Sequence, residues 1–349
     1  MSKVQGQGRR PTMRDVARAA GVSPAAVSQV LNERPEARIG KEARARILAA
    51  VEELGFRPDM TGRQLRLQRT QTLGLITDEI ATSPFAGQIV RAAHDVAWAS
   101  GRLVFLVNTM GDSDVEGRSV RGLLDRRVDG LLYAATYVRE VDVPPETGEV
   151  PTVLVNCFPS AASRELPAVV PAERHGGGLA IRCLIDAGHR DVVYLAGAEH
   201  LWATRERVAA FIEHTQASGL SSSGSPVLYG PYTIDSGYDR AIAVLDAPRR
   251  PTALLCGNDR IALGALLAAQ ALGLTVPRDL SLVGYDDQEE LADRIRPALT
   301  TVSLPHYRLG EIATRALLGL IEGQTPPRVQ EVRGELIERA SVASPPSRR

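Results

Sequence analysis

The chain has 349 residues, long for one domain and sufficient for two or three. Hydrophobic residues make up 44% and charged residues 23%, ordinary proportions that exclude wholesale disorder and a collagen-like chain. The net charge of zero conceals an asymmetry, because residues 1–69 hold 14 Lys and Arg against 7 Asp and Glu, and the rest hold 27 against 34. A basic end on an acidic body favours a polyanionic partner for the basic end.

The three cysteines, Cys157, Cys183 and Cys256, lie far apart without a CxxC pair, and their spacing indicates small buried hydrophobes rather than a disulfide framework. The first residues contain no apolar run of signal-peptide length, and no segment approaches the roughly 18 consecutive apolar residues of a membrane span. We therefore expect a cytoplasmic protein.

The first predicted element is a helix of about eight residues that starts after Thr12. Asp15 stands three residues later, which is a variant of the capping box with a carboxylate in the first turn. Gly21 ends this helix. Its predicted inward residues are Val16, Ala19 and Ala20.

A second short helix begins at Ser23 and Pro24, which combine an N-cap residue with proline at the first helical position. The few residues between the two helices predict a helix-turn-helix. A third helix is expected over residues 41–54, with Gly55 as its C-cap. The predicted inward residues of the second and third helices are Val27, Val30, Leu31, Ala43, Ile47, Ala50, Val51 and Leu54.

From Leu73 onward, short apolar strands alternate with amphipathic helices, a pattern typical of parallel sheet covered on both faces. The strand candidates are LGLIT, LVFLVNT, VDGLLYAA, PTVLVN, VVYLAG, TALLCGND and LSLVGYDD. We predict an α/β protein with a helix-turn-helix domain at 1–58, a polar hinge at 59–72, a bilobed core at 73–340 and a disordered tail at 341–349.

The motifs of an enzyme are missing from the sequence. It contains no GxxxxGK[ST], GxGxxG, HExxH or GxSxG segment. The glycines at 176–178 lack the lysine of a phosphate-binding loop, and the scattered histidines lack metal-ligand spacing. Asp286 and Asp287 end an apolar strand, where at most one can face a given ligand. We expect no catalytic residues, no metal, no cofactor and no enzymatic activity.

The segments TMRDVARAAGVSPAAVSQVLN and ARARILAAVEELGFRPD resemble the DNA-binding headpiece of the lactose/galactose repressor (LacI/GalR) family. The resemblance continues through SPFAGQIVRA, GGGLAIRCLIDAGHRDVVYLAG, CGNDRIALGALLAAQALGLTVPRDLSLVGYDD and LTTVSLPHYRLG, and covers about residues 12–340. It implies three-helix headpieces and a core of two α/β lobes, similar to periplasmic binding proteins, that closes on a ligand.

The resemblance implies that residues 23–32 enter the major groove. Pro24 and Ala25 stand at the two positions that usually choose the operator, and they offer only apolar contact. Gln29 stands where arginine is common, and its amide suits adenine better than guanine. Leu65 matches the leucine that the family wedges into the minor groove. The expected DNA-binding residues are Thr12, Ser23, Pro24, Ala25, Ala26, Ser28, Gln29, Asn32 and Leu65.

The resemblance also places an effector between the core lobes. Asp286 and Asn258 would accept and donate to ligand hydroxyls, Arg207 would supply a forked donor, and Trp202 would either stack on a sugar ring or simply pack. Asp259 is the better candidate for the cap of the following helix, and Trp98 is expected in the core. The expected effector-binding residues are Ser83, Phe85, Asn156, Trp202, Arg207, Tyr232, Asn258 and Asp286.

The resulting hypothesis is a transcriptional repressor that binds double-stranded operator DNA as a homodimer under the control of a sugar or sugar derivative. A purine- or nucleoside-responsive co-repressor of the same fold is the first alternative. A secreted solute-binding protein would have no use for the helix-turn-helix, and a sugar-modifying enzyme would need an acid–base pair. The tail carries no heptad pattern, which favours a dimer over a tetramer.

Overall fold

The protein is described by a computed structural model, which covers residues 11–31, 39–56, 69–80, 86–161, 165–220 and 226–346. The chain divides into two compact units, Met1–Arg69 and Thr70–Arg349. Among the described residues, none of the helices combines the length and the apolar character that a membrane crossing requires.

The first unit is a bundle of three helices, α1 (Met13–Ala20), α2 (Pro24–Leu31) and α3 (Lys41–Glu53). The capping box is confirmed, because the Asp15 carboxylate accepts hydrogen bonds from the Thr12 backbone N–H at 2.9 Å and from its hydroxyl at 2.6 Å. Gly21 ends α1 in the left-handed conformation, with φ of 64°. The buried core consists of Val16, Ala17, Ala20, Val27, Val30, Ile47, Ala50 and Phe56.

The inward face of α1 differs from the prediction at one position. Ala17 is buried and Ala19 is exposed. Ala17 and Ala19 flank the buried pair Val16 and Ala20 on opposite sides of α1, and the bundle packs on the side of Ala17, where the partly buried Met13 also lies one turn away.

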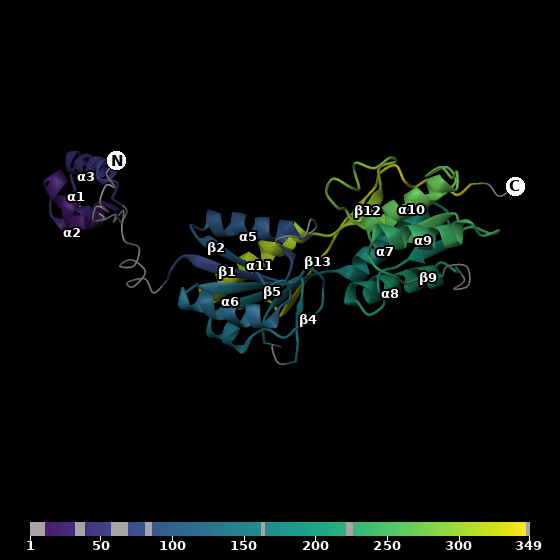
Figure 1. Ribbon diagram of the computed structural model, residues 1–349, viewed down its shortest axis with the longest axis horizontal. Coiled ribbons are helices and arrows are strands. Elements are labelled where there is room, and N and C mark those ends of the chain that lie inside the picture. Colours follow the sequence, from purple (N-terminus) through teal and green to yellow (C-terminus); the bar gives the residue numbers. More distant parts are fainter. Residues whose placement is uncertain are drawn as a thin grey trace, which may run out of the picture. The chain divides into compact units, whose positions relative to one another are not determined.

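The second unit holds two lobes (Figure 1). The first lobe has a parallel sheet in the order β13-β7-β5-β3-β1-β2. Its strands are β1 (Thr72–Thr77), β2 (Leu103–Asn108), β3 (Gly130–Ala134), β5 (Thr152–Val155), β7 (Ala168–Pro171) and β13 (Val329–Val332). Helices α5 (Gly87–Ala99) and α11 (His306–Ile321) cover one face, and α6 (Ser113–Asp125) covers the other. A short pair, β4 (Glu140–Val141) and β6 (Phe158–Pro159), and the 3₁₀ turn η2 (Pro145–Glu149) complete this lobe.

The second lobe repeats the design in the order β14-β12-β11-β10-β8-β9, parallel except that β14 runs antiparallel to β12. Its strands are β8 (Val192–Leu195), β9 (Val227–Leu228), β10 (Ala253–Cys256), β11 (Ser281–Asp286), β12 (Thr300–Ser303) and β14 (Leu336–Ile337). Helices α9 (Ile234–Leu245) and α10 (Asp259–Ala271) pack on one face, and α7 (Glu173–Asp186) and α8 (Trp202–Ala217) on the other.

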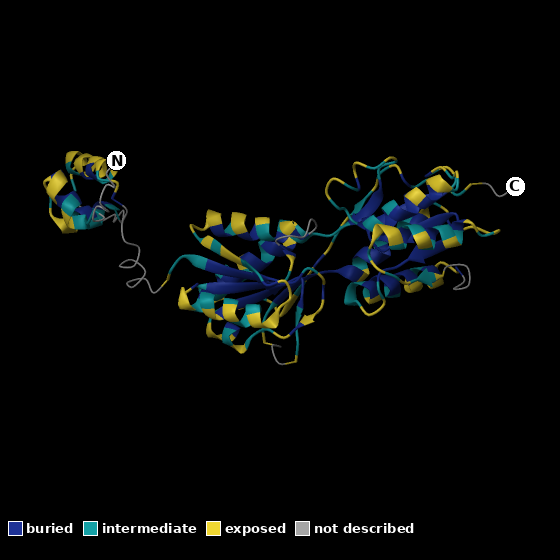
Figure 2. Cartoon of the chain, viewed as in Figure 1, coloured by how far each residue is buried: buried dark blue, intermediate teal, exposed yellow. Residues whose placement is uncertain are grey.

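The central strands of both sheets are buried on both faces, as Figure 2 shows for the centres of both lobes. Successive side chains of β10 alternate between the two cores: Leu254 and Cys256 contact the α9–α10 side, and Ala253 and Leu255 the α7–α8 side. This double burial explains the continuous apolar runs in the sequence. All seven predicted strand segments form strands, and the predicted parallel α/β architecture is confirmed.

The chain passes between the lobes three times: after β7, after β12, and between β13 and β14. As a result α11 and β13, although late in the sequence, belong to the first lobe. The residues that directly follow the first two crossings, Glu173, Leu304 and His306, therefore lie where the two lobes meet, and all three line one pocket.

Two predictions about burial are wrong. Ser341, assigned to a disordered tail, is buried, and its hydroxyl accepts from the Thr300 N–H at 2.8 Å and donates to the Leu282 carbonyl at 2.6 Å. These hydrogen bonds offset the absence of an apolar face in that segment. Trp98 is 66% exposed, because α5 buries the stripe that contains Ala93 and Ala97, and Trp98 lies about 100° further round the helix.

Candidate functional site

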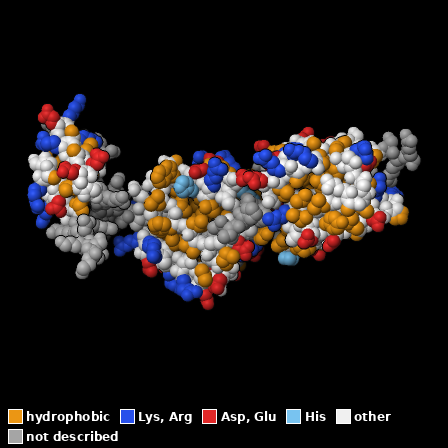
Figure 3. Space-filling model, turned by 45° about the horizontal axis from the view of Figure 1, so that its top comes forward, with side chains coloured by type: hydrophobic (Ala, Val, Ile, Leu, Met, Phe, Trp, Pro, Cys, Tyr) orange, Lys and Arg blue, Asp and Glu red, His pale blue; other side chains and the backbone are white. Residues whose placement is uncertain are grey.

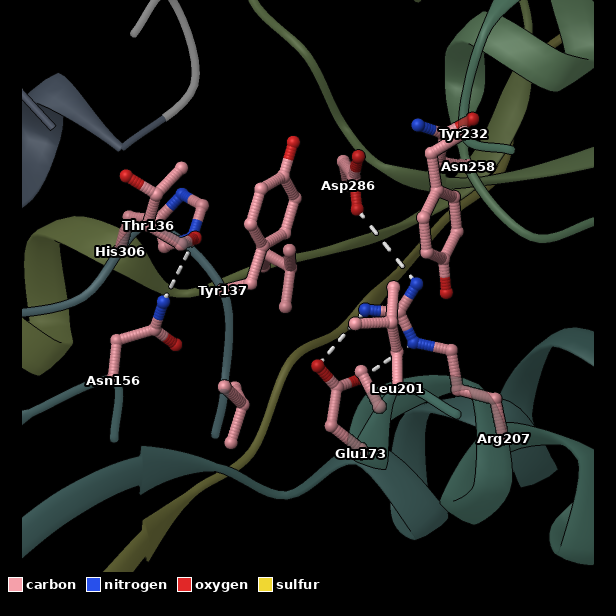
Figure 4. Close-up of a pocket in the computed structure, with 13 residues that line it drawn as sticks. Thr136, Tyr137, Asn156, Glu173, Leu201, Arg207, Tyr232, Asn258, Asp286 and His306 are labelled. Atoms are coloured by element: carbon pink, nitrogen blue, oxygen red, sulfur yellow. Dashed lines mark hydrogen bonds and ion pairs between the residues drawn. The ribbon is translucent and has the colours of Figure 1, made fainter. Parts of the chain in front are cut away.

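A pocket with about 570 Å³ of space, partly open to solvent, lies between the lobes of the second unit. In Figure 4, Thr136 and Asn156 of the first lobe lie on one side, and Arg207, Tyr232 and Asn258 of the second lobe on the other. Its lining combines a few polar groups with apolar and aromatic walls, which is typical of small-molecule sites. The lining residues are Thr136, Tyr137, Val138, Asn156, Glu173, Leu201, Ala203, Arg207, Tyr232, Asn258, Asp286, Leu304 and His306.

Asn156 enters the pocket directly after β5 and is 2% exposed. Its backbone has φ of 56°, a left-handed conformation that asparagine tolerates better than most residues. The side-chain Nδ2 donates to the carbonyls of Ala135 at 2.8 Å and Thr136 at 3.2 Å. Oδ1 is therefore the atom of this amide that can accept a hydrogen bond from a ligand.

Asn258 has two roles in the second lobe. Its Oδ1 accepts from the Ile261 N–H at 2.9 Å and so caps α10, which leaves Nδ2 as a donor at the pocket. The prediction that Asp259 is the cap is wrong. Asp259 is buried and accepts instead from the Thr301 hydroxyl at 2.6 Å and the Gln288 N–H at 2.7 Å, because its side chain is directed under β12.

The adjacent acids at the end of β11 point to different surroundings, as expected. Asp286 lines the pocket, whereas Asp287 forms an ion pair with Arg339 at 2.7 Å. Asp286 has φ of 109°, a strained conformation for a non-glycine residue at the mouth of a site. Burial raises the pKa of Asp286 well above its usual range, and Arg207, whose Nη1 lies 3.9 Å from Oδ1, acts in the opposite direction.

Arg207 lines the pocket, but its fork is occupied. Nε and Nη2 donate to the two carboxylate oxygens of Glu173 at 2.6 and 2.8 Å, and Nη1 donates to the Gly257 carbonyl at 2.7 Å. The guanidinium also lies 3.5 Å from the centre of the Tyr285 ring. The expectation that Arg207 presents a free fork to a ligand is therefore corrected, because a buried carboxylate already fills it.

Aromatic side chains from each lobe, Tyr137 and Tyr232, line the pocket, and the Tyr232 hydroxyl is 2.8 Å from that of Thr204. Trp202 does not line it. Its ring packs edge-to-face against Phe158 at 4.9 Å in an adjoining groove. Trp202 is the first residue of α8, and the residues on either side of it, Leu201 and Ala203, face the pocket instead.

Several pocket residues escaped the sequence prediction. Glu173 follows the strand AVVP at a crossing, and Leu304 follows β12, so strand ends were the available signal. The glycines at 176–178 lie within α7, where a Cβ at Gly177 would come within 2.9 Å of the Arg207 backbone. They serve close helix packing, and a phosphate loop is excluded there. Ser83 and Phe85 lie outside the described residues.

A second surface concerns the first unit. Ser23, Pro24 and Ala25 are exposed at the start of α2, and the next-turn residues Ser28 and Gln29 are half-buried. The Ser23 hydroxyl oxygen accepts from the Ala26 N–H at 3.2 Å, which confirms it as the N-cap. Val27 and Val30 hold the opposite face in the bundle, so this face of α2 is available for contact. Asn32 and Leu65 lie outside the described residues.

Large exposed hydrophobic side chains occur near one edge of the first lobe, where β2 is the edge strand of its sheet. Figure 3 shows hydrophobic side chains gathered on this lobe in the face it presents. On β2 and in the chain segments that flank it, the large exposed hydrophobic residues are Trp98, Leu103, Phe105, Leu106 and Met110. We call these five residues the β2 edge patch. Among the described residues, no group of His, Cys, Asp and Glu is arranged to hold a metal ion.

Comparison with known proteins identifies the class. Residues 12–59 match the family described as bacterial regulatory proteins, lacI family, and residues 181–342 match a periplasmic binding protein-like domain. The chain therefore belongs to the lacI family of DNA-binding transcriptional regulators, as the sequence motifs predicted.

Individual relatives cover nearly its whole length. The HTH-type transcriptional repressor PurR of Yersinia enterocolitica is 32% identical over 97% of this chain and 98% of its own. The ribose operon repressor of Escherichia coli K12 is 33% identical over 93% and 96%. A crystal structure of the Lac repressor dimer bound to operator and the anti-inducer ONPF is 27% identical, with a TM-score of 0.79, and covers 96% of this chain and all of that one.

Proposed function

We propose that this protein is a repressor whose operator binding is relieved by a neutral, hydroxylated small molecule, a sugar or sugar derivative. The observation that carries the proposal is the pocket between the lobes. It offers an acceptor at Asn156 Oδ1, a donor at Asn258 Nδ2 and the carboxyl group of Asp286 among apolar and aromatic walls. A molecule with several hydroxyl groups satisfies donors and acceptors of this kind at once.

The DNA contact is proposed for the exposed face of α2. Pro24 and Ala25 would make apolar contact with base edges, such as a thymine methyl, and Gln29 would pair with adenine. Thr12, Ser23, Ala26 and Ser28 would contact phosphates or the backbone. Because the partner is DNA, the protein would act in the cytoplasm. The basic charge of residues 1–69 adds sequence-independent attraction to it.

The protein would act as a homodimer, so that two copies of α2 read a pseudo-palindromic site. The β2 edge patch supplies exposed apolar surface of the kind that subunit contacts bury. Ligand-driven closure of the lobes would change the placement of the two linkers. The coupling is limited by the difference in affinity of the ligand for the two states.

The test is selection of bound duplexes from a random DNA pool by the purified protein, with and without a mixture of neutral sugars. We expect an enriched pseudo-palindrome whose recovery falls when the sugars are present. A folded dimer that enriches no site under either condition would contradict the regulator, and a site indifferent to every sugar would contradict the effector class.

A purine-type co-repressor is the second candidate, favoured by the rings of Tyr137 and Tyr232 and by the PurR relatives. Aromatic rings stack on planar bases as well as on sugars. Calorimetric titration with pure purine bases, nucleosides and sugars separates the two candidates. Binding of a purine that strengthens DNA binding would replace the sugar proposal.

A further inference from the structure

Arg207 and Glu173 form a closed ion pair at the back of the pocket. The side chains are 5% and 1% exposed, and their two parallel hydrogen bonds are 2.6 and 2.8 Å long. The hydroxyl of Tyr285 donates a third hydrogen bond to Glu173 Oε2 at 2.8 Å. This two-pronged geometry is the one by which arginine recognises carboxylates and phosphates of ligands.

The remaining surface of the guanidinium is also in use. Nη1 donates to the Gly257 carbonyl at 2.7 Å, and the Tyr285 ring covers one face. Among the described residues that line the pocket, Arg207 is the one Lys or Arg. An anion that enters the pocket must therefore displace Glu173 if it is to pair with Arg207, and the other group of the described lining that could carry a positive charge is the imidazole of His306.

We propose that Glu173 is a built-in anion that occupies the carboxylate or phosphate position at Arg207, and so restricts the effector to uncharged molecules. This inference rests on the proposed function and specifies it: sugar phosphates, sugar acids and nucleotides are excluded, and Glu173 is the residue that determines this specificity. Displacing Glu173 would leave a buried carboxylate without its cation, which is strongly unfavourable.

Asp286, the other acidic residue that lines the pocket, also disfavours the binding of an anion. Asp286 lies 3.9 Å from Arg207, and burial raises its pKa. When ionised, Asp286 repels a ligand anion at short range in a low-dielectric site, and when protonated it offers a hydrogen bond but no positive charge. Neither protonation state of Asp286 neutralises the negative charge of an incoming phosphate.

The first test is chemical rescue of Glu173→Ala in the full-length protein. This variant leaves a carboxylate-sized space beside Arg207, so we expect a lower Tm that acetate restores in a saturable way. Chloride at equal ionic strength should not restore it, and wild type should not respond to acetate. Glu213→Ala is the matched control, because it removes the carboxylate of another Arg–Glu pair, with Arg174, on the surface.

The second test compares ligand pairs of matched shape: ribose with ribose 5-phosphate, glucose with glucose 6-phosphate, and galactose with galacturonate. We expect the neutral member of each pair to raise the Tm of the wild-type protein and the charged member to leave it unchanged. Glu173→Gln frees one edge of the Arg207 fork while keeping the shape of the side chain, and it should move the ratio of affinities toward the charged member at least tenfold.

The outcomes separate the two proposals. A Tm of Glu173→Ala that acetate leaves unchanged, or wild type stabilised by a charged member as strongly as by its neutral partner, would overturn the role of Glu173. If wild type responds to no sugar, the sugar form of the proposed function fails, and the acetate result still decides the assignment of Glu173. If Glu173→Ala does not fold, the affinity ratio of Glu173→Gln decides it.

Discussion

Asn258 divides its amide between the fold and the pocket, and this division determines which hydrogen bond remains for a ligand. Oδ1 caps α10, so Nδ2 is the donor left at the pocket. Asn156 shows the reverse, because Nδ2 binds two carbonyls and Oδ1 is left as the acceptor. The specificity of the pocket thus depends on hydrogen bonds that fold the backbone as much as on residue type.

Asp286→Asn should raise stability more at high pH than at low pH. The pKa of Asp286 is raised in the folded state, so its contribution to stability is present below the unfolded pKa and is lost as pH rises through the folded value. We expect a gain of about 1 kcal/mol at pH 8, roughly 2–4 °C in Tm, and little gain at pH 4. Thermal melts from pH 4 to pH 8 measure this difference, and a gain that is the same at every pH would contradict it.

Gln29→Arg should change the preferred base at one operator position from adenine to guanine. Arginine donates two hydrogen bonds to the guanine edge, a pairing that discriminates by about 1–3 kcal/mol. Selection from a random DNA pool by the variant reveals the change. Leu48→Arg, which adds the same charge at an exposed position of α3, is the matched control. It should raise affinity for all sequences alike, and an equal shift of base preference in both variants would refute the role of Gln29.

At the level of elements, local signals decide where helices begin and end, and distant contacts decide how the last segment is held. The imidazole of His189 bridges Thr252 Oγ1 and the Ala343 carbonyl, both at 2.9 Å. Ser281 and Ser341 add further hydrogen bonds to the same stretch. This stretch is therefore part of the second lobe, although its composition predicts disorder.

His189→Ala should destabilise the protein by about 2–4 kcal/mol at pH 7, because it leaves buried polar groups unpaired and a cavity beside them. Burial lowers the pKa of His189, with the Ala343 bond acting in the opposite direction. The stabilisation that His189 contributes should therefore decrease as pH falls from 7 to 5, since the unfolded chain binds the proton more readily. Urea unfolding at both pH values should show a smaller difference in stability between wild type and His189→Ala at pH 5 than at pH 7. His94→Ala, which removes an exposed imidazole, should retain the pH dependence of the wild type.

At the scale of the whole molecule, three crossings join the two lobes, and residues that line the pocket lie beside them. Glu173 and His306 each lie within three residues of a crossing. The Gln88 amide of α5 also donates to Glu289 of the second lobe at 2.6 Å, across the lobes. A movement of one lobe relative to the other would therefore directly displace groups that line or border the pocket.

Phe105→Glu should convert the dimer to a monomer. The residue lies on the exposed edge strand β2 within the β2 edge patch, and a charge there cannot be buried without a partner. Sedimentation should show the loss of dimer, and operator affinity should fall at least tenfold because two half-sites no longer bind together. Ile212→Glu, at an exposed apolar position on α8, should remain dimeric. A dimeric Phe105→Glu would place the subunit contact elsewhere.

The sequence by itself determined the basic helical unit with its caps, the positions of seven strands and the parallel α/β class. These predictions succeed because capping and hydrophobic periodicity are local properties of neighbouring residues. The expectation that Asn156, Arg207, Tyr232, Asn258 and Asp286 would meet at one pocket came instead from the resemblance to the family, and all five line that pocket.

Only the tertiary structure decided what those side chains do. Glu173 meets Arg207 across 34 residues and Tyr285 across 112, and Ser341 binds Leu282 across 59. The placement of Trp202 outside the pocket likewise depends on the packing of α8. Contacts between distant segments depend on strand order and on the crossings between the lobes. No local sequence pattern therefore predicts which carboxylate pairs with a buried arginine such as Arg207.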